Sequence, residues 1–245
     1  MNTGIMAHVQ KTTRNGQTPL TKDMILRSAV SIVDDQGLQA LTIRKVADSL
    51  GVYPTAITWH IGSKDQLVAD ASGLVFETLQ LPDDKAHDWK DWLRLTGRSF
   101  RDSMHQHPNF AVVIGSQLHT SLPALPFVER VLRLLNDNGL EGASLLKAYN
   151  AYVGCLIGWV SLELSSTGAT PADAEGRLGV LNNLDQRLYT ALSRNLSLVA
   201  NKAFMVRWDS GITNPMDESF EFMLESVLAG IADSIEQSAM PASVE

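Results

Sequence analysis

Apolar residues recur at spacings of three and four along most of the chain, a pattern that predicts helices. The first such segment begins at Thr21, a residue suited to capping a helix, and ends at Gln36 before Gly37. Longer segments are expected from Asp88 through Met104, over Phe127–Leu135, over Gly142–Ser165 and over Asp217–Gln237. Strand-like alternation is absent from the sequence, which therefore predicts an all-α fold.

Between the last two long segments the pattern weakens. Residues 167–179 contain glycine, proline and several charges, and we expect a mobile connection there. Residues 181–203 are expected to be helical again, with weak boundaries. The stretch Ala148–Leu164 is the most apolar of the chain, but it falls short of the ~20 apolar residues of a membrane span. It is interpreted as a helix buried on most sides.

Short segments crowd the first third of the chain. Thr42 is expected to cap a helix that stops at Gly51, and a third helix begins near Pro54, a residue favoured at the first helical position. Ser63 and Gln66 are expected to form a capping box for a fourth helix that continues to Pro82. Two short helices joined by a tight turn are typical of a helix-turn-helix.

The turn has the residues that this geometry requires. Ala47 is small where the two helices meet, Gly51 tolerates a left-handed backbone, and Val52 is apolar. Ile57 and Ile61 recur four residues apart and are expected to face inward. The residues left for a DNA duplex are Tyr53, Thr55, Ala56, Thr58, Trp59 and His60. Two alternatives remain open here: Trp59 as a core residue, and His60 as a surface histidine without a role.

Charge is divided unevenly along the chain. The net charge is −7, yet residues 1–65 hold seven Lys and Arg against five Asp and Glu, a balance of +2. The remainder therefore carries −9, so the positive end can approach a polyanion. Within it, Arg44 is placed to reach guanine or a phosphate, and Lys64 lies at a helix N-terminus that also favours phosphate. Residues 1–20 are expected to be a disordered leader, or else a basic arm for the minor groove.

The cysteine count and the N-terminus bear on the compartment. Cys155 is the single cysteine, so no disulfide can form within the chain, which suits a reducing cytoplasm. The first nineteen residues are polar and show no secretory signal.

The helix-turn-helix region resembles the TetR family. The resemblance rests on an ungapped run of residue types: Leu41 to Ala47, then Gly51 to Ile61, then Ser63 to Leu67. It implies phosphate contacts from Thr42, Trp59, His60 and Lys64, and base contacts near Arg44, Pro54, Thr55 and Ala56. Thr58 departs from the family, which usually has tyrosine there, and this puts the docking or the operator preference in doubt.

The rest of the chain resembles the C-terminal domain of the tetracycline-repressor type. The resemblance implies a homodimer held by a four-helix bundle, with Gly154, Gly158, Leu224, Val227, Leu228 and Ile231 as candidate interface residues. It also implies a small-molecule effector, expected to be apolar or aromatic, with candidate lining residues Trp92, Phe100, Met104, His107, Phe110, His119, Tyr149, Tyr152 and Trp159. Tetracycline is not predicted as the effector. His105, His107, His119 and Glu163 are the side chains available to a metal, but we expect no metal and no cofactor.

The sequence thus predicts a DNA-binding transcriptional regulator of three parts. These are a disordered N-terminal arm over residues 1–20, a three-helix helix-turn-helix domain over 21–67, and a helical ligand-binding and dimerisation domain over 68–240. A ligand-released repressor on a palindromic operator is favoured, and a ligand-responsive activator remains an alternative. An enzyme is disfavoured because no nucleophile elbow, phosphate loop or His-x3-His pair occurs. An architectural DNA-binding protein is disfavoured by the acidic body.

Overall fold

A computed structural model describes residues 19–83, 87–117, 122–165 and 171–239, and within these ranges every regular element is a helix. The predicted all-α class is therefore confirmed. The α-helices are α1 (Lys22–Gln36), α2 (Ile43–Leu50), α3 (Pro54–Ile61), α4 (Lys64–Phe76), α5 (Trp89–Gln106), α6 (Pro108–Gln117), α7 (Leu125–Asp137), α8 (Gly142–Leu164), α9 (Pro171–Asn182), α10 (Thr190–Val199) and α11 (Asp217–Ala239). Short 3-10 turns occupy Leu38–Ala40, Leu122–Ala124 and Phe204–Val206.

Four helices begin directly after a residue whose side chain caps the first turn. The hydroxyl oxygens of Thr21, Thr42 and Ser63 accept hydrogen bonds from the backbone N–H groups three residues later. Asp88 caps α5 in the same way. These bonds satisfy N–H groups that the first turn of a helix leaves without partners. The starts of α1, α2, α4 and α5 therefore lie where the sequence predicted them.

Helices α1 to α4 form a compact head. Its core consists of apolar side chains with little or no exposed surface, including Ile25, Ala29, Val46, Ile57 and Leu67. Helix α4 packs on α1 in the head and on α6 in the body. The predicted domain boundary after Leu67 thus falls inside one continuous helix. Residues 1–18 of the predicted N-terminal arm lie outside the described residues.

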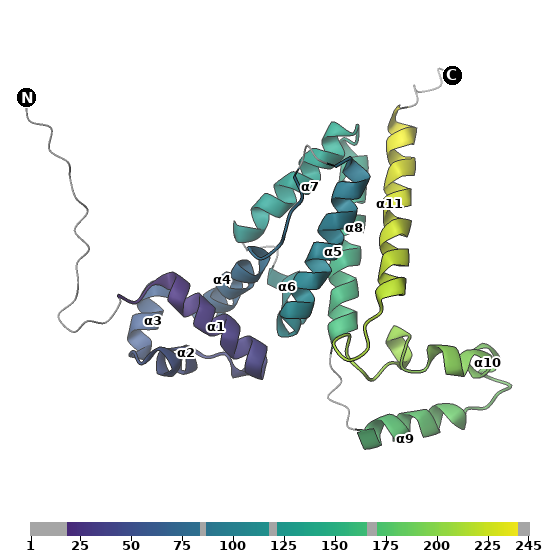
Figure 1. Ribbon diagram of the computed structural model, residues 1–245, viewed down its shortest axis with the longest axis horizontal. Helices are drawn as coiled ribbons and strands as arrows, with labels where there is room; N and C mark the ends of the chain where they lie inside the picture. Colours follow the sequence, from purple (N-terminus) through teal and green to yellow (C-terminus); the bar gives the residue numbers. More distant parts are fainter. Residues whose placement is uncertain (1–18, 84–86, 118–121, 166–170, 240–245) are drawn as a thin grey trace, which may run out of the picture.

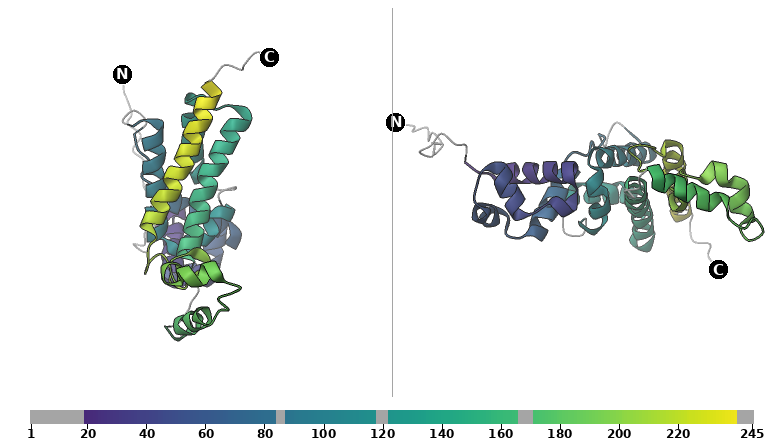
Figure 2. Two further views of the ribbon diagram at one scale, coloured as in Figure 1. Left: turned by 90° about the vertical axis from the view of Figure 1, so that its right-hand side faces the viewer. Right: turned by 90° about the horizontal axis from the view of Figure 1, so that it is seen from below.

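Helices α5 to α8 and α11 form the body, and α9 and α10 form an arm. Figure 1 shows α5, α8 and α11 running side by side, with α9 and α10 projecting from the lower end of α8. The second view, from the right-hand side, shows α8 and α11 together as one broad face of the body, with the arm below it (Figure 2). Contacts between α8 and α11 and between α5 and α11 agree with this arrangement.

Three expectations about helix bounds were wrong. Residues 171–179, expected within a mobile connection, belong to α9, which starts at a proline and has Asp173 in its first turn. The helix expected over 181–203 is shorter, because a turn over 183–189 separates α9 from α10. The fourth helix also ends early, at Phe76 rather than near Pro82.

Candidate nucleic-acid interface and body site

The turn between α2 and α3 has the backbone that its sequence predicts. Gly51 has φ 65°, in the left-handed region, and its N–H donates to the carbonyl oxygens of Ala47 and Asp48. The N–H of Val52 also donates to Ala47, at 3.0 Å. Ala47 itself has no exposed surface. Any side chain at residue 51 would be strained, so glycine fixes the angle between the two helices.

Helix α3 divides into a buried and an exposed face. Ile57 and Ile61 are buried at 0% and 6% exposure, as their spacing predicted. Tyr53 and Trp59 are 83% and 82% exposed, and the His60 ring meets the Trp59 ring edge-on with centroids 4.7 Å apart. The alternative that Trp59 is a core residue is therefore wrong. Large apolar side chains held in water on a rigid helix are typical of a binding surface.

The other predicted DNA contacts lie on or beside this face. Thr42, Arg44, Pro54, Thr55, Thr58 and Lys64 are exposed, and Ala56 and His60 are partly exposed. The Arg44 side chain is 86% exposed, and its nearest carboxylate, Asp48, is 3.9 Å away. Lys64 begins α4, whose first-turn N–H groups add positive potential. The head therefore exposes two cations and a helix N-terminus in the segments that precede and follow α3 along the chain.

Two threonine hydroxyls on this surface are already engaged. Thr58 donates to the Pro54 carbonyl oxygen at 3.1 Å, which leaves mainly its methyl group for another molecule. The Thr42 oxygen accepts from the Lys45 N–H at 3.1 Å and keeps its proton for donation. Thr42 therefore fits a phosphate oxygen better than Thr58 does.

Polar contacts join the head to the body. The Asn109 amide at the start of α6 donates to the carbonyl oxygens of Val33 and Asp34, at 2.9 and 3.1 Å. His107 Nδ1 lies 2.9 Å from an Asp34 carboxylate oxygen. Burial raises the pKa of Asp34, while the bond to His107 opposes that shift. The end of α1 is thus tied to the joint between α5 and α6. His107 also lines a hollow of about 570 Å³ beside α1 and α4, whose wall includes none of the other predicted ligand residues.

Most other predicted ligand contacts are core residues. Trp92, Phe100, Met104, Phe110 and Tyr152 are all at 2% exposure or less. The polar atoms of two of them are satisfied inside the chain, since the Tyr152 hydroxyl donates to the Leu93 carbonyl oxygen and Trp92 Nε1 donates to that of Pro82. Burial raises the pKa of Tyr152. As they stand, these residues fill the body rather than line a cavity.

The remaining ligand candidates differ from these. Tyr149 and Trp159 are partly exposed on α8, and Trp159 lies edge-on to Phe204 with ring centroids 4.9 Å apart. His119 lies outside the described residues. Among the described residues, no cluster of three or more His, Cys, Asp or Glu side chains has the geometry to hold a metal ion.

Glu163 is the centre of a buried polar network that the sequence did not reveal. Its side chain is fully buried and bonds Arg101 through two hydrogen bonds, at 2.6 and 2.9 Å. It also accepts from Trp159 Nε1 at 3.1 Å and from the Met216 N–H at 2.9 Å. Burial alone would raise the pKa of Glu163, but its hydrogen-bond donors outweigh burial and lower it. One carboxylate therefore joins α5, α8 and the segment before α11.

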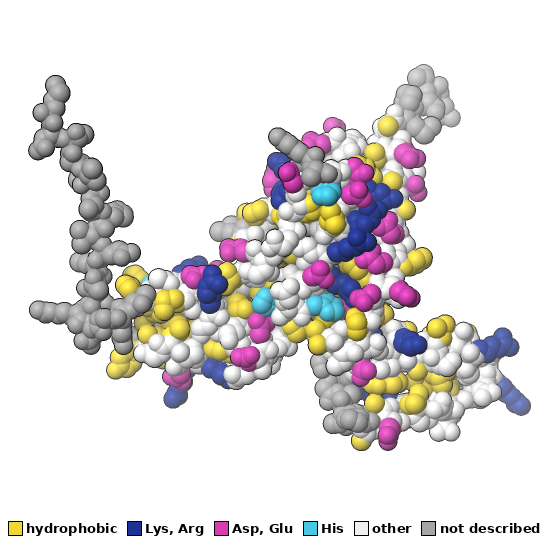
Figure 3. Space-filling view, viewed as in Figure 1, with side chains coloured by type: hydrophobic (Ala, Val, Ile, Leu, Met, Phe, Trp, Pro, Cys, Tyr) yellow, Lys and Arg dark blue, Asp and Glu magenta, His cyan; other side chains and the backbone are white. Residues whose placement is uncertain are grey.

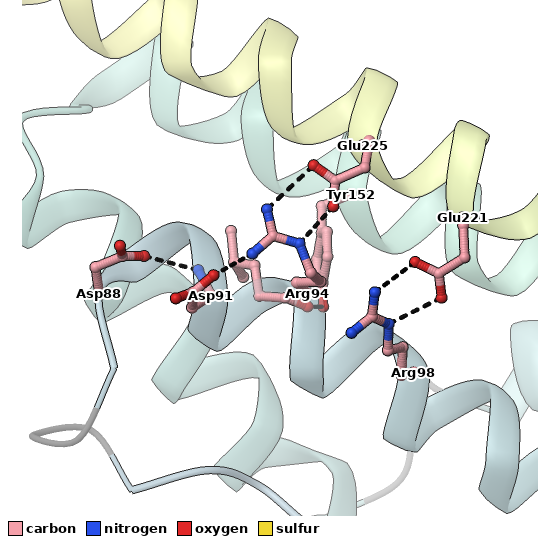
Figure 4. Close-up of polar contacts among 8 residues, drawn as sticks. Asp88, Asp91, Arg94, Arg98, Tyr152, Glu221 and Glu225 are labelled. Carbon is pink, nitrogen blue, oxygen red and sulfur yellow. Dashed lines mark hydrogen bonds and ion pairs between the residues drawn. The ribbon is translucent and has the colours of Figure 1, made fainter.

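Ion pairs continue this junction along the surface of α5. Arg98 bonds Glu221 through two hydrogen bonds, at 2.8 and 2.6 Å, and Arg94 pairs with both Glu225 and Asp91 (Figure 4). Figure 3 shows Lys and Arg side chains gathered on the body, with acidic side chains beside them. Arg94 and Arg98 thus bind α5 to α11.

The face formed by α8 and α11 is apolar and open. Leu146, Leu162 and Phe222 are 58%, 52% and 78% exposed, and a Cβ added at Gly154 or Gly158 would meet nothing within 4 Å. The expectation that α8 is buried on most sides is therefore wrong. Leu224, Leu228 and Ile231 are at 3% exposure or less, because they face the chain's own core. Of the predicted interface residues, Gly154, Gly158 and Val227 keep exposed surface.

By length and composition alone helix α8 could span a membrane, since it has 23 residues and an 18-residue window of it has a mean hydropathy of 1.2. The same helix contributes the buried side chains Tyr152, Leu156 and Val160 to the helical body. Packing within the body therefore explains why this helix is apolar.

The head exposes α3, the second helix of the helix-turn-helix, and is joined to a larger helical body. This arrangement is that of helix-turn-helix regulators. Comparison with known proteins supports the same class. Residues 25–71 match the family model for bacterial regulatory proteins of the tetR family, and residues 81–235 match the model for the tetracyclin repressor-like C-terminal domain. The chain therefore belongs to the TetR family and has a tetracycline-repressor-like C-terminal domain.

Individual relatives support the same assignment. An HTH-type transcriptional regulator of Saccharopolyspora erythraea is 31% identical over 144 residues, 59% of this chain and 61% of that one, so the match spans under two thirds of its length. The class C tetracycline repressor protein of Escherichia coli is 31% identical over 165 residues, 64% of this chain and 71% of its own. The fold is also that of apo ActR from Streptomyces coelicolor, with a TM-score of 0.73 at 22% identity over 91% of this chain and 100% of that one.

Proposed function

We propose that this protein is a cytoplasmic repressor that binds a palindromic operator as a homodimer and is released by a small apolar ligand. The observation that carries the DNA-binding part is the exposed face of α3, where Tyr53 and Trp59 stand in water above the buried Ile57 and Ile61. Arg44 and Lys64 are exposed cations in the neighbouring helices and are available for phosphate binding. The relatives named repressors and the operator complex of the structural neighbour BioQ support the same role.

Contact roles follow from the exposed groups. Thr42, Trp59, His60 and Lys64 bind the phosphate backbone, and Arg44, Tyr53, Pro54, Thr55, Ala56 and Thr58 lie at the base edges. Since the Thr58 hydroxyl is engaged within α3, its methyl group is the part that meets a base. A thymine methyl is the natural partner for such a group.

The open face of α8 and α11 is the proposed dimer interface. Leu146, Leu162 and Phe222 would be removed from water by a second copy, and the glycines at 154 and 158 allow another helix to approach closely. A symmetric dimer holds two recognition helices about 34 Å apart, which matches half-sites one helical turn apart on the same side of the duplex.

The dimer is tested by Gly158→Leu. Within the chain a Cβ at residue 158 meets nothing within 4 Å, so we expect the fold to be retained and a clash to arise only against a partner. Sedimentation equilibrium should show wild type as a dimer and Gly158→Leu as a monomer of unchanged far-UV circular dichroism. The control Gly179→Leu, on α9, also meets nothing within 4 Å and should remain a dimer. A dimeric Gly158→Leu protein would contradict this interface.

The operator is tested by selection from a pool of random duplexes with the full-length protein. We expect enrichment of an inverted repeat with half-site centres about 10 base pairs apart. Enrichment of no common sequence would contradict an operator-specific function.

The proposal that a small ligand releases the repressor is supported by ligand binding in a structural neighbour and is constrained by the packing of the body. The structural neighbour ActR has been solved in complex with actinorhodin. Since the predicted ligand residues at the centre of this body are packed, a ligand there would have to displace core side chains. Release needs only a ligand with different affinities for two conformers, and a coupling of about 1–3 kcal/mol changes DNA affinity 5- to 150-fold.

A further inference from the structure

Arg207 is a buried cation without a bonded carboxylate among the described residues. It is 8% exposed, its Nε donates to the Asp209 carbonyl oxygen at 2.7 Å, and Nη2 donates to the Asn214 carbonyl oxygen. Its Nη1 has no hydrogen-bond partner in the described structure. Burial lowers the pKa of Arg207, and the charges of Glu163 and Asp209 only partly oppose this.

The two nearby carboxylates are already engaged by other groups. Glu163 bonds Arg101 through two hydrogen bonds, and the Asp209 carboxylate accepts from the Asn201 amide at 2.6 Å. Arg101, in contrast, is buried to a similar degree but bonds two carboxylates, Glu163 and Asp217. A guanidinium taken out of water without a bonded anion is costly, so Arg207 has capacity for an anion that the chain does not supply.

Arg207 also lines a hollow of about 490 Å³ between α9 and the segment that returns from α10. The apolar part of its wall includes Val180, Leu181 and Val206, and the ring of Trp208 borders it as well. Figure 3 shows hydrophobic side chains gathered on this arm. A volume in this range is typical of sites for small organic ligands.

The charges around the hollow favour an acid. Arg177 and Arg207 line it together with one carboxylate, Asp173, so the wall has one positive charge in excess. Arg177 is exposed at the rim, whereas Arg207 is buried. An acidic group would therefore be drawn to the rim and bound most strongly at the buried guanidinium.

We propose that this hollow binds a small apolar molecule with one carboxylate, which accepts a hydrogen bond from Arg207 Nη1 while the apolar body contacts Val180, Val206 and Trp208. The inference goes beyond the proposed function, because the hollow belongs to the arm and includes none of the residues predicted to line the effector site. Its test uses no DNA, so failure of operator binding and failure of this site are separate results.

The segment that lines the hollow is also bonded to the body. The segment that contains Arg207 returns to α8 at Gly211, whose N–H donates to the Glu163 carbonyl oxygen at 2.6 Å. A Cβ at residue 211 would lie 2.5 Å from Glu163 Cγ, so only glycine permits this approach. A ligand that orders Arg207 would therefore act on the segment that is joined to α8 and α5 through Glu163.

The test is binding of 6-fluoro-2-naphthoate to the full-length protein, followed by fluorine NMR, with the neutral 6-fluoro-2-naphthamide as the matched ligand. A hydrogen bond to a charged group contributes about 1.5–3 kcal/mol, so we expect the carboxylate to bind about tenfold or more tightly than the amide. Absence of saturable binding, or equal affinity for the two ligands, would overturn the proposal.

Two variants locate the bound probe without disturbing the fold. Val180 is 68% exposed and lines the hollow, so Val180→Asp should weaken naphthoate binding about tenfold or more by placing a like charge beside the ligand. Leu188 is 77% exposed on the same arm but does not line the hollow, and Leu188→Asp should leave the affinity unchanged. Equal effects of the two substitutions, or none from Val180→Asp, would place the probe elsewhere and overturn the assignment.

Arg207 is tested by Arg207→Lys, which keeps the charge but loses the fork that holds Asp209 and Asn214. The variant should weaken naphthoate binding several-fold and leave naphthamide binding unchanged. If both ligands lose affinity equally, the effect is on the shape of the hollow, and the role of Arg207 Nη1 is contradicted.

Discussion

The head and the junction of α5, α8 and α11 are held together by different forces. The head core is apolar, with Ile25, Val46 and Ile57 at 0% exposure, and its capping hydrogen bonds lie at its surface. The junction instead buries charges, with Arg101 and Glu163 at 9% and 0% exposure. An apolar core is insensitive to pH, whereas a buried ion pair depends on both partners remaining charged. We therefore expect pH and charge substitutions to act on the body and leave the head intact.

The largest expected effect is that of Glu163→Gln. Removing the charge leaves Arg101 buried with only the exposed Asp217 as its partner, so the free energy of unfolding of the body should fall by about 3–5 kcal/mol. Urea denaturation measures this loss. The control Glu221→Gln breaks the more exposed pair with Arg98, and it should cost about 0–1 kcal/mol. Equal losses for the two variants would show that burial is not what distinguishes the junction.

The Glu163 carboxylate should also make the stability of the body depend on pH. Burial would raise the pKa of Glu163, but the hydrogen bonds from Arg101 and from the Met216 N–H hold it below its usual range. A lowered folded-state pKa stabilises the protein above the unfolded-state pKa, and this contribution disappears as pH falls toward the folded-state value. Body stability should thus decline below about pH 4.3, the ordinary glutamate pKa, and less steeply in Glu163→Gln. An unchanged slope in the variant would assign the pH dependence to other groups.

In the head, Ile57→Ala should cost about 2–5 kcal/mol, because a fully buried side chain is lost from a small core. Hydrogen exchange should then accelerate across α1 to α3 and remain slow in α8, with no dependence on pH beyond the intrinsic exchange rate. Thr58→Ala, at an exposed neighbour, is the control and should change stability by less than about 0.5 kcal/mol. Faster exchange in α8 as well would mean that head and body unfold as one unit.

The smallest expected effect is that of Lys64→Ala on DNA binding. Loss of one phosphate contact should weaken binding to all duplexes alike and reduce the slope of log affinity against log salt by about 1. The control Arg187→Ala, an exposed cation on the arm, should leave the slope unchanged. A loss confined to one operator base would contradict the phosphate role.

The head could be predicted from the sequence because its determinants are local. Gly51, the capping residues and the spacing of Ile57 and Ile61 act within a few residues of one another, and each lies where it was expected. The exposure of Trp59 was left open, since a half-apolar helix position is compatible with either face.

The body was predicted less well because its determinants are distant in sequence. Arg101 and Glu163 are 62 positions apart, and no spacing rule links them. The aromatic residues proposed to line a ligand site have the same spacing as core residues, and packing placed Phe100 and Tyr152 in the core. Helix α9 was missed because its glycines favour a loop by propensity.

The central claim, that the exposed face of α3 reads an operator, is tested most directly by the ratio of affinities for a selected duplex and for a scrambled duplex of equal length, measured across a salt titration. The proposed function predicts a ratio of about 10³ or more at physiological salt. Equal affinity for both duplexes at every salt concentration would contradict it and would favour a DNA-binding protein that does not read sequence.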